Sequence, residues 1–210
     1  GFAYALANAG VSVLDQLDES AVWFEVGAGT GALAEKVLLR LQALDKLPAQ
    51  YWILEPSADL RERQQQRLKS AVTPDVFARC VWLDTPPEEV WQGVMVANEV
   101  IDALPTTRFI IDEGEVYEEC VALDDKQNFR RVMCPADGMV AGAVRHIEKN
   151  LDRLFLDGYC SEVLPQLPYW IQAVAGTMQK GAMLFVDYGY ARDEYYLPER
   201  DDGTLLCHYR

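Results

Sequence analysis

A short apolar run that ends in a glycine cluster constrains the fold of this chain more than any other feature. Residues Val22–Val26 are apolar apart from Glu25, and they lead directly into Gly27–Gly31, with the sequence GAGTG. An apolar stripe with helical spacing follows at Leu33, Val37, Leu38, Leu41 and Leu44. Glycine is favoured where a backbone turns tightly or approaches a ligand without a Cβ in the way. The pattern predicts a buried strand, a glycine-rich turn and a helix whose free N–H groups can hold an anionic group.

Strand and helix signals alternate along the rest of the chain. Four further apolar runs are predicted to be strands: Gln50–Leu54, Cys80–Leu83, Gly93–Ala97 and Ala182–Asp187. Ser57 is a good N-cap for a helix after the first of these runs, and another helix is predicted over roughly Leu164–Gln179. Such alternation is typical of an α/β fold with a mostly parallel, twisted sheet and helices on both faces.

Residues Phe109–Val140 break this alternation. Three segments in and around it alternate between apolar and polar residues across short turns: Arg108–Asp112, Val116–Leu123 and Asn128–Met133. We interpret them as an antiparallel insertion after the fourth strand. An insertion at this point lies over the carboxyl ends of the strands, where open α/β sheets bind ligands. Residues 109–140 are therefore a candidate substrate region within a single domain expected over residues 1–210.

Composition excludes several function classes. The chain has 33 acidic and 19 basic residues and a net charge of −14, which repels phosphate backbones and argues against a nucleic-acid partner. The charge suits a cationic ligand or a basic protein segment, or it serves only to keep the protein in solution. No apolar run reaches the roughly 18 residues of a membrane span. Five scattered cysteines without a C-x-x-C pair, and only two histidines, argue for a reducing compartment and against a disulfide framework or metal site.

The glycine turn alone does not identify a cofactor. Gly27, Gly29 and Ala32 also satisfy the dinucleotide fingerprint with alanine in its third place. However, Glu25 stands two residues before the first glycine, where it would be close to a pyrophosphate and repelled by it. S-adenosylmethionine carries no phosphate, and its sulfonium and ammonium groups tolerate or attract a carboxylate. Glu25 therefore favours S-adenosylmethionine over a nicotinamide cofactor.

Two further acids follow predicted strands. Glu55 comes 24 residues after Gly31, where the hydroxyl groups of a ribose need an acceptor. Both cofactors contain a ribose, so Glu55 indicates a nucleoside without choosing between them. Asp84 follows the third predicted strand and is a candidate partner for an adenine amine.

Polar residues also follow the fourth and fifth predicted strands. Asn98–Pro105, with the sequence NEVIDALP, places two acids and an amide where a methyl acceptor would lie. The spacing alone favours another explanation, in which this segment begins a helix and its acids interact with the helix dipole. The fifth strand ends in Asp187, which is followed by Tyr188. We interpret Tyr188 as a wall or turn residue.

Four segments taken together resemble one family of methyltransferases: Glu25–Gly31, Leu54–Leu68, Asn98–Phe109 and Leu184–Tyr190. It is the family that includes the mitochondrial complex I assembly arginine methyltransferase and its bacterial relatives. Gly203-Thr204-Leu205, followed by Tyr209, is similar to that family's next block. The glycine motif is common to all class I methyltransferases, whereas the segment NEVIDALP is far more specific.

The resemblance implies a Rossmann-like class I methyltransferase fold of seven strands, so we expect this chain to be truncated at both ends. It also implies that a methyl group passes from S-adenosylmethionine to an arginine of a partner protein. The expected setting is the bacterial cytoplasm or the mitochondrial matrix. The sequence leaves the oligomeric state open.

These interpretations yield a set of candidate site residues. Glu99 is the first candidate for holding an arginine guanidinium, with Asp102 and Asp187 as lesser candidates. The candidate cofactor-binding residues are Glu25, Gly27, Ala28, Gly29, Gly31, Glu55, Pro56, Ser57, Asp84 and Asn98. No residues are assigned to a metal.

Two functions from other classes compete with this one. The first is a nicotinamide-dependent dehydrogenase, disfavoured by Glu25 and by the lack of an obvious His, Lys or Tyr proton donor. The second is an assembly or scaffold protein that keeps a residual S-adenosylmethionine site and acts by docking a partner.

Overall fold

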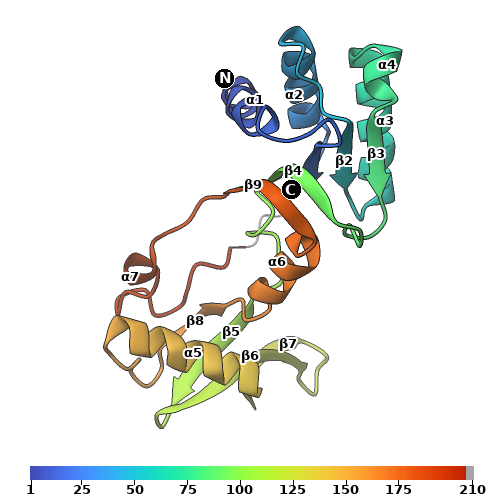
Figure 1. Cartoon of the computed structure of the whole chain (residues 1–210). Coiled ribbons are helices and arrows are strands. Elements are labelled where there is room, and N and C mark those ends of the chain that lie inside the picture. The colour runs from blue at the N-terminus through green and yellow to red at the C-terminus, as the bar shows by residue number, and fades with distance from the viewer. Residues whose placement is uncertain (207–210) are drawn as a thin grey trace. The chain divides into compact units, whose positions relative to one another are not determined.

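The computed structural model describes residues 1–206, which divide into two compact units (Figure 1). The first unit comprises Gly1–Ala103 and Tyr169–Tyr188, and the second comprises Leu104–Pro168 and the residues from Gly189 onward. The single domain expected over residues 1–210 stays a prediction. Tyr209, which belongs to one of the segments with family resemblance, lies outside the described residues.

The first unit contains a five-stranded, all-parallel sheet with the strand order β3-β2-β1-β4-β9. The strands are β1 (Val22–Val26), β2 (Gln50–Leu54), β3 (Cys80–Leu83), β4 (Trp91–Asn98) and β9 (Met178–Val186). The bounds of β1, β2 and β3 coincide with those predicted from the sequence. β4 is longer at both ends than its prediction.

The boundary between the last helix and the last strand of this unit was predicted wrongly. Helix α6 spans Leu167–Ala175 and does not continue to Gln179. Gly176 ends it, and the backbone of Trp91 then donates a hydrogen bond to Thr177 O. Strand β9 therefore begins at Met178, four residues before the predicted start, because β4 already offers a pairing partner there.

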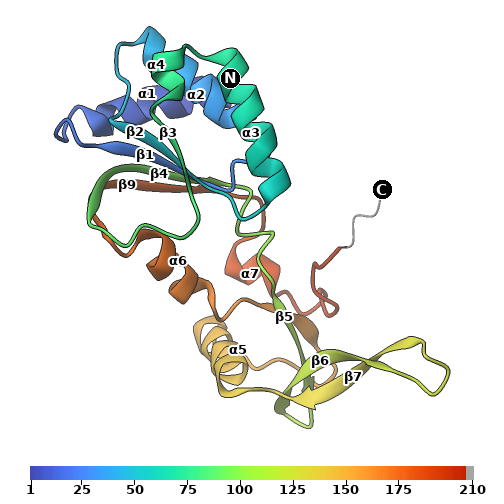
Figure 2. The same cartoon turned by 90° about the vertical axis from the view of Figure 1, so that its right-hand side faces the viewer.

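Helices cover both faces of the parallel sheet. α1 (Phe2–Leu14), α2 (Ala32–Ala43), α3 (Ala58–Ala71) and α4 (Pro74–Phe77) lie on one face and α6 on the other (Figure 2). Successive side chains of a strand point to opposite faces. Accordingly, Trp23 packs with the buried side of α2, while Phe24 packs in a second cluster with Val174 and Ala175 of α6.

The strand order places a topological switch point between β1 and β4. The chain builds outward from β1 through β2 to β3 and then returns to β4 on the other side of β1. Ligands of open α/β sheets bind at the carboxyl ends of the strands at such a point. The segments that follow β1 and β4 therefore meet where a ligand is expected.

The second unit contains a four-stranded antiparallel sheet with the order β7-β6-β5-β8. Its elements are β5 (Thr107–Asp112), β6 (Glu115–Leu123), β7 (Phe129–Pro135), α5 (Gly138–Leu151), β8 (Cys160–Val163) and α7 (Arg192–Tyr195). The antiparallel insertion was thus predicted correctly in kind. The inserted unit extends beyond the predicted end at residue 140, because β8 pairs with β5. Neither α5 nor β8 was predicted.

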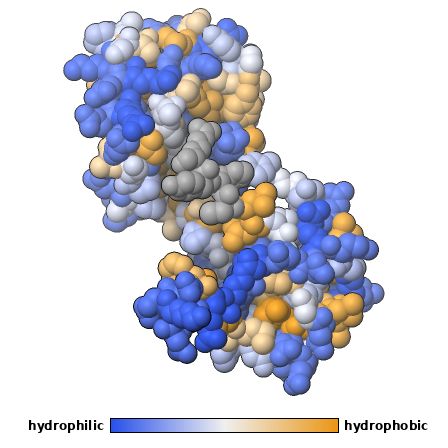
Figure 3. Space-filling model, turned by 180° about the vertical axis from the view of Figure 1, so that it is seen from behind, coloured by the Kyte–Doolittle hydropathy of each residue, from blue (hydrophilic) through white to orange (hydrophobic). Residues whose placement is uncertain are grey.

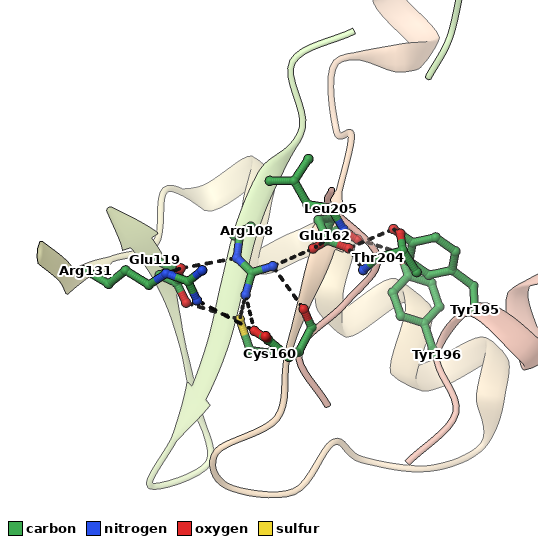
Figure 4. A network of polar contacts seen from close by, with 10 residues as sticks. Arg108, Glu119, Arg131, Cys160, Glu162, Tyr195, Tyr196, Thr204 and Leu205 are labelled. Atoms are coloured by element: carbon green, nitrogen blue, oxygen red, sulfur yellow. Dashed lines mark hydrogen bonds and ion pairs between the residues drawn. The ribbon is translucent and has the colours of Figure 1, made fainter. Parts of the chain in front are cut away.

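The two faces of this second sheet differ in character. Phe109 and Ile111 are buried against α5 in an apolar cluster. Arg108 alternates with them and points to the other face, where its guanidinium contacts Glu162 at 2.7 Å and Glu119 at 3.2 Å (Figure 4). These three residues anchor a partly buried ionic network that supports the sheet.

The same network holds a distant segment of the chain against β8. Glu162 is 3% exposed and accepts hydrogen bonds from Tyr195 Oη and from the backbone N–H of Thr204, both at 2.9 Å (Figure 4). Arg108 also bonds the side chain of Asp202 at 2.6 Å. Gly203 leaves no room for a side chain, since a Cβ there would stand 2.1 Å from a Glu162 oxygen. The segment with family resemblance at residues 203–205 is therefore fixed by a buried carboxylate.

The face of the molecule shown in Figure 3 is largely hydrophilic, with smaller apolar areas between the polar ones. Among residues 1–206, no helix is both long enough and apolar enough to cross a membrane.

Candidate functional site

The turn after β1 has a backbone that only glycine adopts readily. Gly27, Gly29 and Gly31 all lie in the left-handed region, with φ of 67°, 52° and 77°. A Cβ on Gly27 would stand 2.9 Å from the Val100 side chain, whereas a Cβ on Gly29 would meet nothing within 4 Å. The turn is thus packed on one side and open on the other. The open side lies beside the free N–H groups at the start of α2, a kind of place where anionic groups bind favourably.

Glu25 is buried beneath this turn. Its side chain is 2% exposed, and its Oε2 accepts a hydrogen bond of 2.5 Å from Tyr51 Oη on β2. Burial raises the pKa of the Glu25 carboxyl to about 7, although the hydrogen bond from Tyr51 opposes the rise. Glu25 is therefore poised between its neutral and charged forms near neutral pH. Its contact with the amino-acid end of a cofactor stays a prediction.

Glu55 lies directly after β2 and close to the glycine turn. Its side chain is 5% exposed, and the backbone N–H of Ser57 donates to its Oε1 at 3.0 Å. Its Oε2 accepts a hydrogen bond of 3.2 Å from Gln64 Nε2. The end of β2 is tied to the turn itself, because Gly27 N donates to Leu54 O at 2.9 Å. The Glu55 carboxylate is therefore buried and fixed by hydrogen bonds, unlike a solvent-exposed acid at the end of a strand.

Ser57 has the role of N-cap that the sequence predicted. Its Oγ accepts a hydrogen bond from Leu60 N at 3.4 Å, at the start of α3. Asp84, the candidate for the adenine amine, pairs with Arg61 of α3 at 2.5 Å and leaves 85% of its side chain exposed. The roles of Pro56, Ser57 and Asp84 toward a cofactor stay predictions.

The loop after β4 is not the start of a helix. No helix begins between Asn98 and Thr107, so the explanation of its acids as a helix N-terminus is wrong. Glu99 instead has a left-handed φ of 52°, and its N–H donates to Val186 O of β9 at 2.8 Å. A left-handed conformation costs a residue other than glycine about 1 kcal/mol or more. Such strain persists only where the surrounding structure holds it in place.

Asp187 and Tyr188 hold this loop. Asp187 Oδ2 accepts hydrogen bonds from the backbone N–H groups of Ile101 at 3.0 Å and Asp102 at 3.2 Å. Tyr188 Oη donates to Asp102 Oδ2 at 2.6 Å, and this hydrogen bond raises the pKa of Tyr188. The sequence missed this role of Tyr188, because only the fold brings the ends of β4 and β9 together.

These contacts rank the three carboxylates that the sequence proposed for the methyl acceptor. Asp102 and Asp187 are already engaged in holding the loop. The Glu99 side chain has no hydrogen bond or ion pair with any other residue in the described part of the chain. It is exposed, and it follows β4 at the topological switch point. Of the three, Glu99 is best placed to receive a ligand.

A surface depression lies at the opposite ends of the strands. It is lined by residues from the segments 14–21 and 45–49, which precede β1 and β2. Open α/β sheets bind their ligands at the carboxyl ends instead. This depression therefore has no place in the candidate site.

Two solved structures resemble this chain over its whole length. One is a COG1565 superfamily protein from Burkholderia thailandensis bound to S-adenosyl-homocysteine, with 35% identity and a TM-score of 0.86. The match covers 100% of this chain and 52% of that protein. The other is a native structure of a COG1565 superfamily protein from Burkholderia thailandensis, with 34% identity, a TM-score of 0.86, and coverage of 99% and 54%. The chain thus spans about half the length of these proteins. A comparison with curated proteins finds no match.

A family profile covers residues 5–210, and the family is described as "Putative S-adenosyl-L-methionine-dependent methyltransferase". The class I methyltransferase fold predicted from the sequence is confirmed, and so is S-adenosylmethionine as the cofactor. The nicotinamide-dependent dehydrogenase considered above finds no support in these comparisons. By its sequence, its sheet topology and its glycine turn, the chain belongs to this family of S-adenosylmethionine-dependent methyltransferases.

Proposed function

We propose that this chain is part of an enzyme that methylates an arginine of a partner protein. It carries the cofactor site and, at the carboxyl ends of the parallel strands, residues that bind the acceptor. The observation that carries the proposal is the Glu99 side chain, held on a strained and braced loop with no partner among residues 1–206. S-adenosylmethionine supplies a methyl group already activated by its sulfonium. The protein's contribution is then mainly to position the acceptor and exclude water.

The geometry of the first unit supports the cofactor assignments. The open side of the turn at Gly27–Gly31 fits the carboxylate of the cofactor's amino-acid end, and Glu25 beneath it fits the ammonium. Glu55 fits the ribose hydroxyls as a bidentate acceptor. The remaining candidates, Ala28, Pro56, Ser57, Asp84 and Asn98, line the same end of the sheet.

An arginine acceptor explains why the Glu99 carboxylate, which has no partner among residues 1–206, would be placed after β4. The guanidinium has a pKa above about 12 and no free lone pair at neutral pH. A carboxylate can hold its fork bidentately and draw the positive charge toward the bound nitrogens. The net charge of −14 also favours a basic protein segment over an anionic acceptor. The link to complex I assembly comes from the family resemblance alone.

Replacing Glu55 by alanine is expected to weaken the binding of S-adenosylhomocysteine about 30-fold, or ~2 kcal/mol, because two charge-assisted hydrogen bonds to the ribose would be lost. Calorimetric titration of the wild-type chain and the variant measures this effect. Glu62→Ala is the matched control, since Glu62 is an exposed glutamate of the following helix, α3, and this variant should bind like the wild type. Binding of NAD, or equal binding by both variants, would contradict the assignment.

Replacing Glu99 by glutamine is expected to lower methyl transfer about 30-fold, or ~2 kcal/mol, because the charged partner of the guanidinium is lost. The measurement is the incorporation of tritiated methyl groups from S-adenosylmethionine into the proteins of a cell extract, followed by analysis for methylarginine. S-adenosylhomocysteine should bind the variant normally.

Glu113→Gln is the control for this variant, since Glu113 is also an exposed glutamate with a left-handed φ, in the turn before β6. Methyl transfer that survives Glu99→Gln would remove Glu99 from the proposed role. Methyl groups found on another amino acid or on a small amine would contradict the arginine acceptor. Capture of a partner without any methyl incorporation would favour the scaffold function instead.

A further inference from the structure

Gln64 is the one uncharged polar side chain that is fully buried on helix α3. The residues on either side of it along the helix, Arg63 and Gln65, are exposed. Burying an amide is costly unless its hydrogen-bonding groups find partners. The partners of Gln64 therefore show what this side chain contributes.

Those partners belong to both halves of the proposed cofactor site. Gln64 Nε2 donates to Gly29 O in the glycine turn at 2.8 Å and to Glu55 Oε2 at 3.2 Å. Gln64 Oε1 accepts a hydrogen bond from Trp82 Nε1 on β3 at 3.0 Å. One amide thus joins the turn after β1 to the carboxylate after β2.

The contact with Trp82 fixes which way the amide points. An indole N–H can only donate, so it requires the oxygen of Gln64 on its side. The NH₂ group must then face Gly29 and Glu55, where both of its hydrogens find acceptors. Gly31 also packs closely against this residue, since a Cβ on Gly31 would stand 3.3 Å from both Cα and Cγ of Gln64.

We propose that Gln64 is a positioning residue for recognition of the cofactor's ribose, acting through the carboxylate of Glu55. Backbone Ser57 N holds one oxygen of this carboxylate and Gln64 holds the other, so its rotation is fixed before a ligand arrives. A preorganised acceptor loses less conformational freedom when it binds a pair of hydroxyl groups. The inference rests on the proposed function, since it assumes that Glu55 receives a ribose.

The test compares two ligands that differ only at the ribose: S-adenosylhomocysteine and its 2′,3′-dideoxy analogue. The wild type is expected to bind the first more tightly. Gln64→Leu, a substitution of similar size without the amide, should weaken S-adenosylhomocysteine binding about tenfold. It should change binding of the 2′,3′-dideoxy analogue less than twofold, because that analogue lacks both hydroxyl groups that the oriented carboxylate would receive.

Gln65→Leu is the matched control, since Gln65 is the exposed neighbour on the same helix and should bind both ligands like the wild type. Gln64→Glu is the second variant in case the leucine variant fails to fold. It keeps an acceptor for Trp82 and replaces the donor to Glu55 by a repelling charge, so it should lose the same ribose selectivity.

An equal loss for both ligands would show a merely structural role and overturn the proposal. Unchanged binding of both ligands by Gln64→Leu would overturn it as well. If the wild type binds S-adenosylhomocysteine and Gln64→Leu discriminates between the two ligands as the wild type does, the proposal for Gln64 is wrong. The proposed function is then unaffected. A wild type that binds neither ligand would overturn both.

Discussion

Substituting Gly93 by alanine is expected to destabilise the parallel sheet by about 4 kcal/mol, a large fraction of the roughly 5–15 kcal/mol that keeps a typical domain folded. Gly93 lies in β4 opposite Val22 of β1, with a φ of 154°. A Cβ at this position would stand 1.9 Å from Val22 O. That oxygen is part of the backbone and cannot rotate away as a side chain could. The two central strands would have to separate locally.

Urea denaturation followed by circular dichroism measures this effect. Gly142→Ala is the control, because Gly142 lies inside α5 and a Cβ there would meet nothing within 4 Å. Alanine is the better helix former, so this variant should be more stable than the wild type by up to about 1 kcal/mol. A Gly93→Ala protein that unfolds at the same urea concentration as the wild type would contradict this prediction, because β1 and β4 would then have room for a Cβ at position 93.

The inner strands of the parallel sheet could be predicted from the sequence because they are buried on both faces. Such strands are short continuous apolar runs bounded by turn residues, as in Val22–Val26. Strand β9 was placed too late because Gln179 and Lys180, which follow its first residue, are polar and exposed. Their pairing with β4 is a property of the fold and leaves no apolar pattern.

Strand β8 was not predicted, for a different reason. Its sequence, Cys-Ser-Glu-Val, contains two polar residues, yet all four residues are buried. Glu162 can be buried there because Arg108, far away in the sequence, neutralises it. A pattern of apolar residues cannot reveal a strand whose burial depends on a distant ion pair.

The same distinction applies to the candidate site. Glu25, the glycines and Glu55 could be proposed because they stand at fixed places in a strand–turn–helix pattern. Gln64 and Tyr188 could not, because their partners Gly29 and Asp102 become neighbours only when the helix packs and the strands align. The chemistry of the acids was readable from the sequence, whereas their positioning was not.

Replacing Glu25 by glutamine is expected to remove a pH-dependent loss of stability of about 3 kcal/mol. The pKa of Glu25 is about 7 in the folded protein, against a value of 4.5 for an unperturbed glutamate. Between these two pH values the folded state holds a proton that the unfolded state has released. Stability from this group is therefore complete below pH 4.5, falls as the pH rises, and is lost above pH 7.

The difference in unfolding free energy between the wild type and Glu25→Gln isolates this contribution from all other titrating groups. Measured by urea denaturation from pH 5 to pH 8, it should shift by about 2.5 kcal/mol in favour of the variant as the pH rises, since the rest of the effect falls outside this range. Glu62→Gln, an exchange on the exposed side of α3, should show no comparable shift. A difference that stays constant with pH would mean that Glu25 is charged throughout this range.

The same substitution tests the link between Glu25 and the cofactor. A buried carboxylate that is costly to ionise becomes less costly when a ligand brings an ammonium group to it. S-adenosylhomocysteine should then stabilise the wild type more at pH 8 than at pH 6, and this gain should be absent in Glu25→Gln. If ligand stabilisation is equally independent of pH in both proteins, the ammonium lies elsewhere and Glu25 serves only its bond with Tyr51.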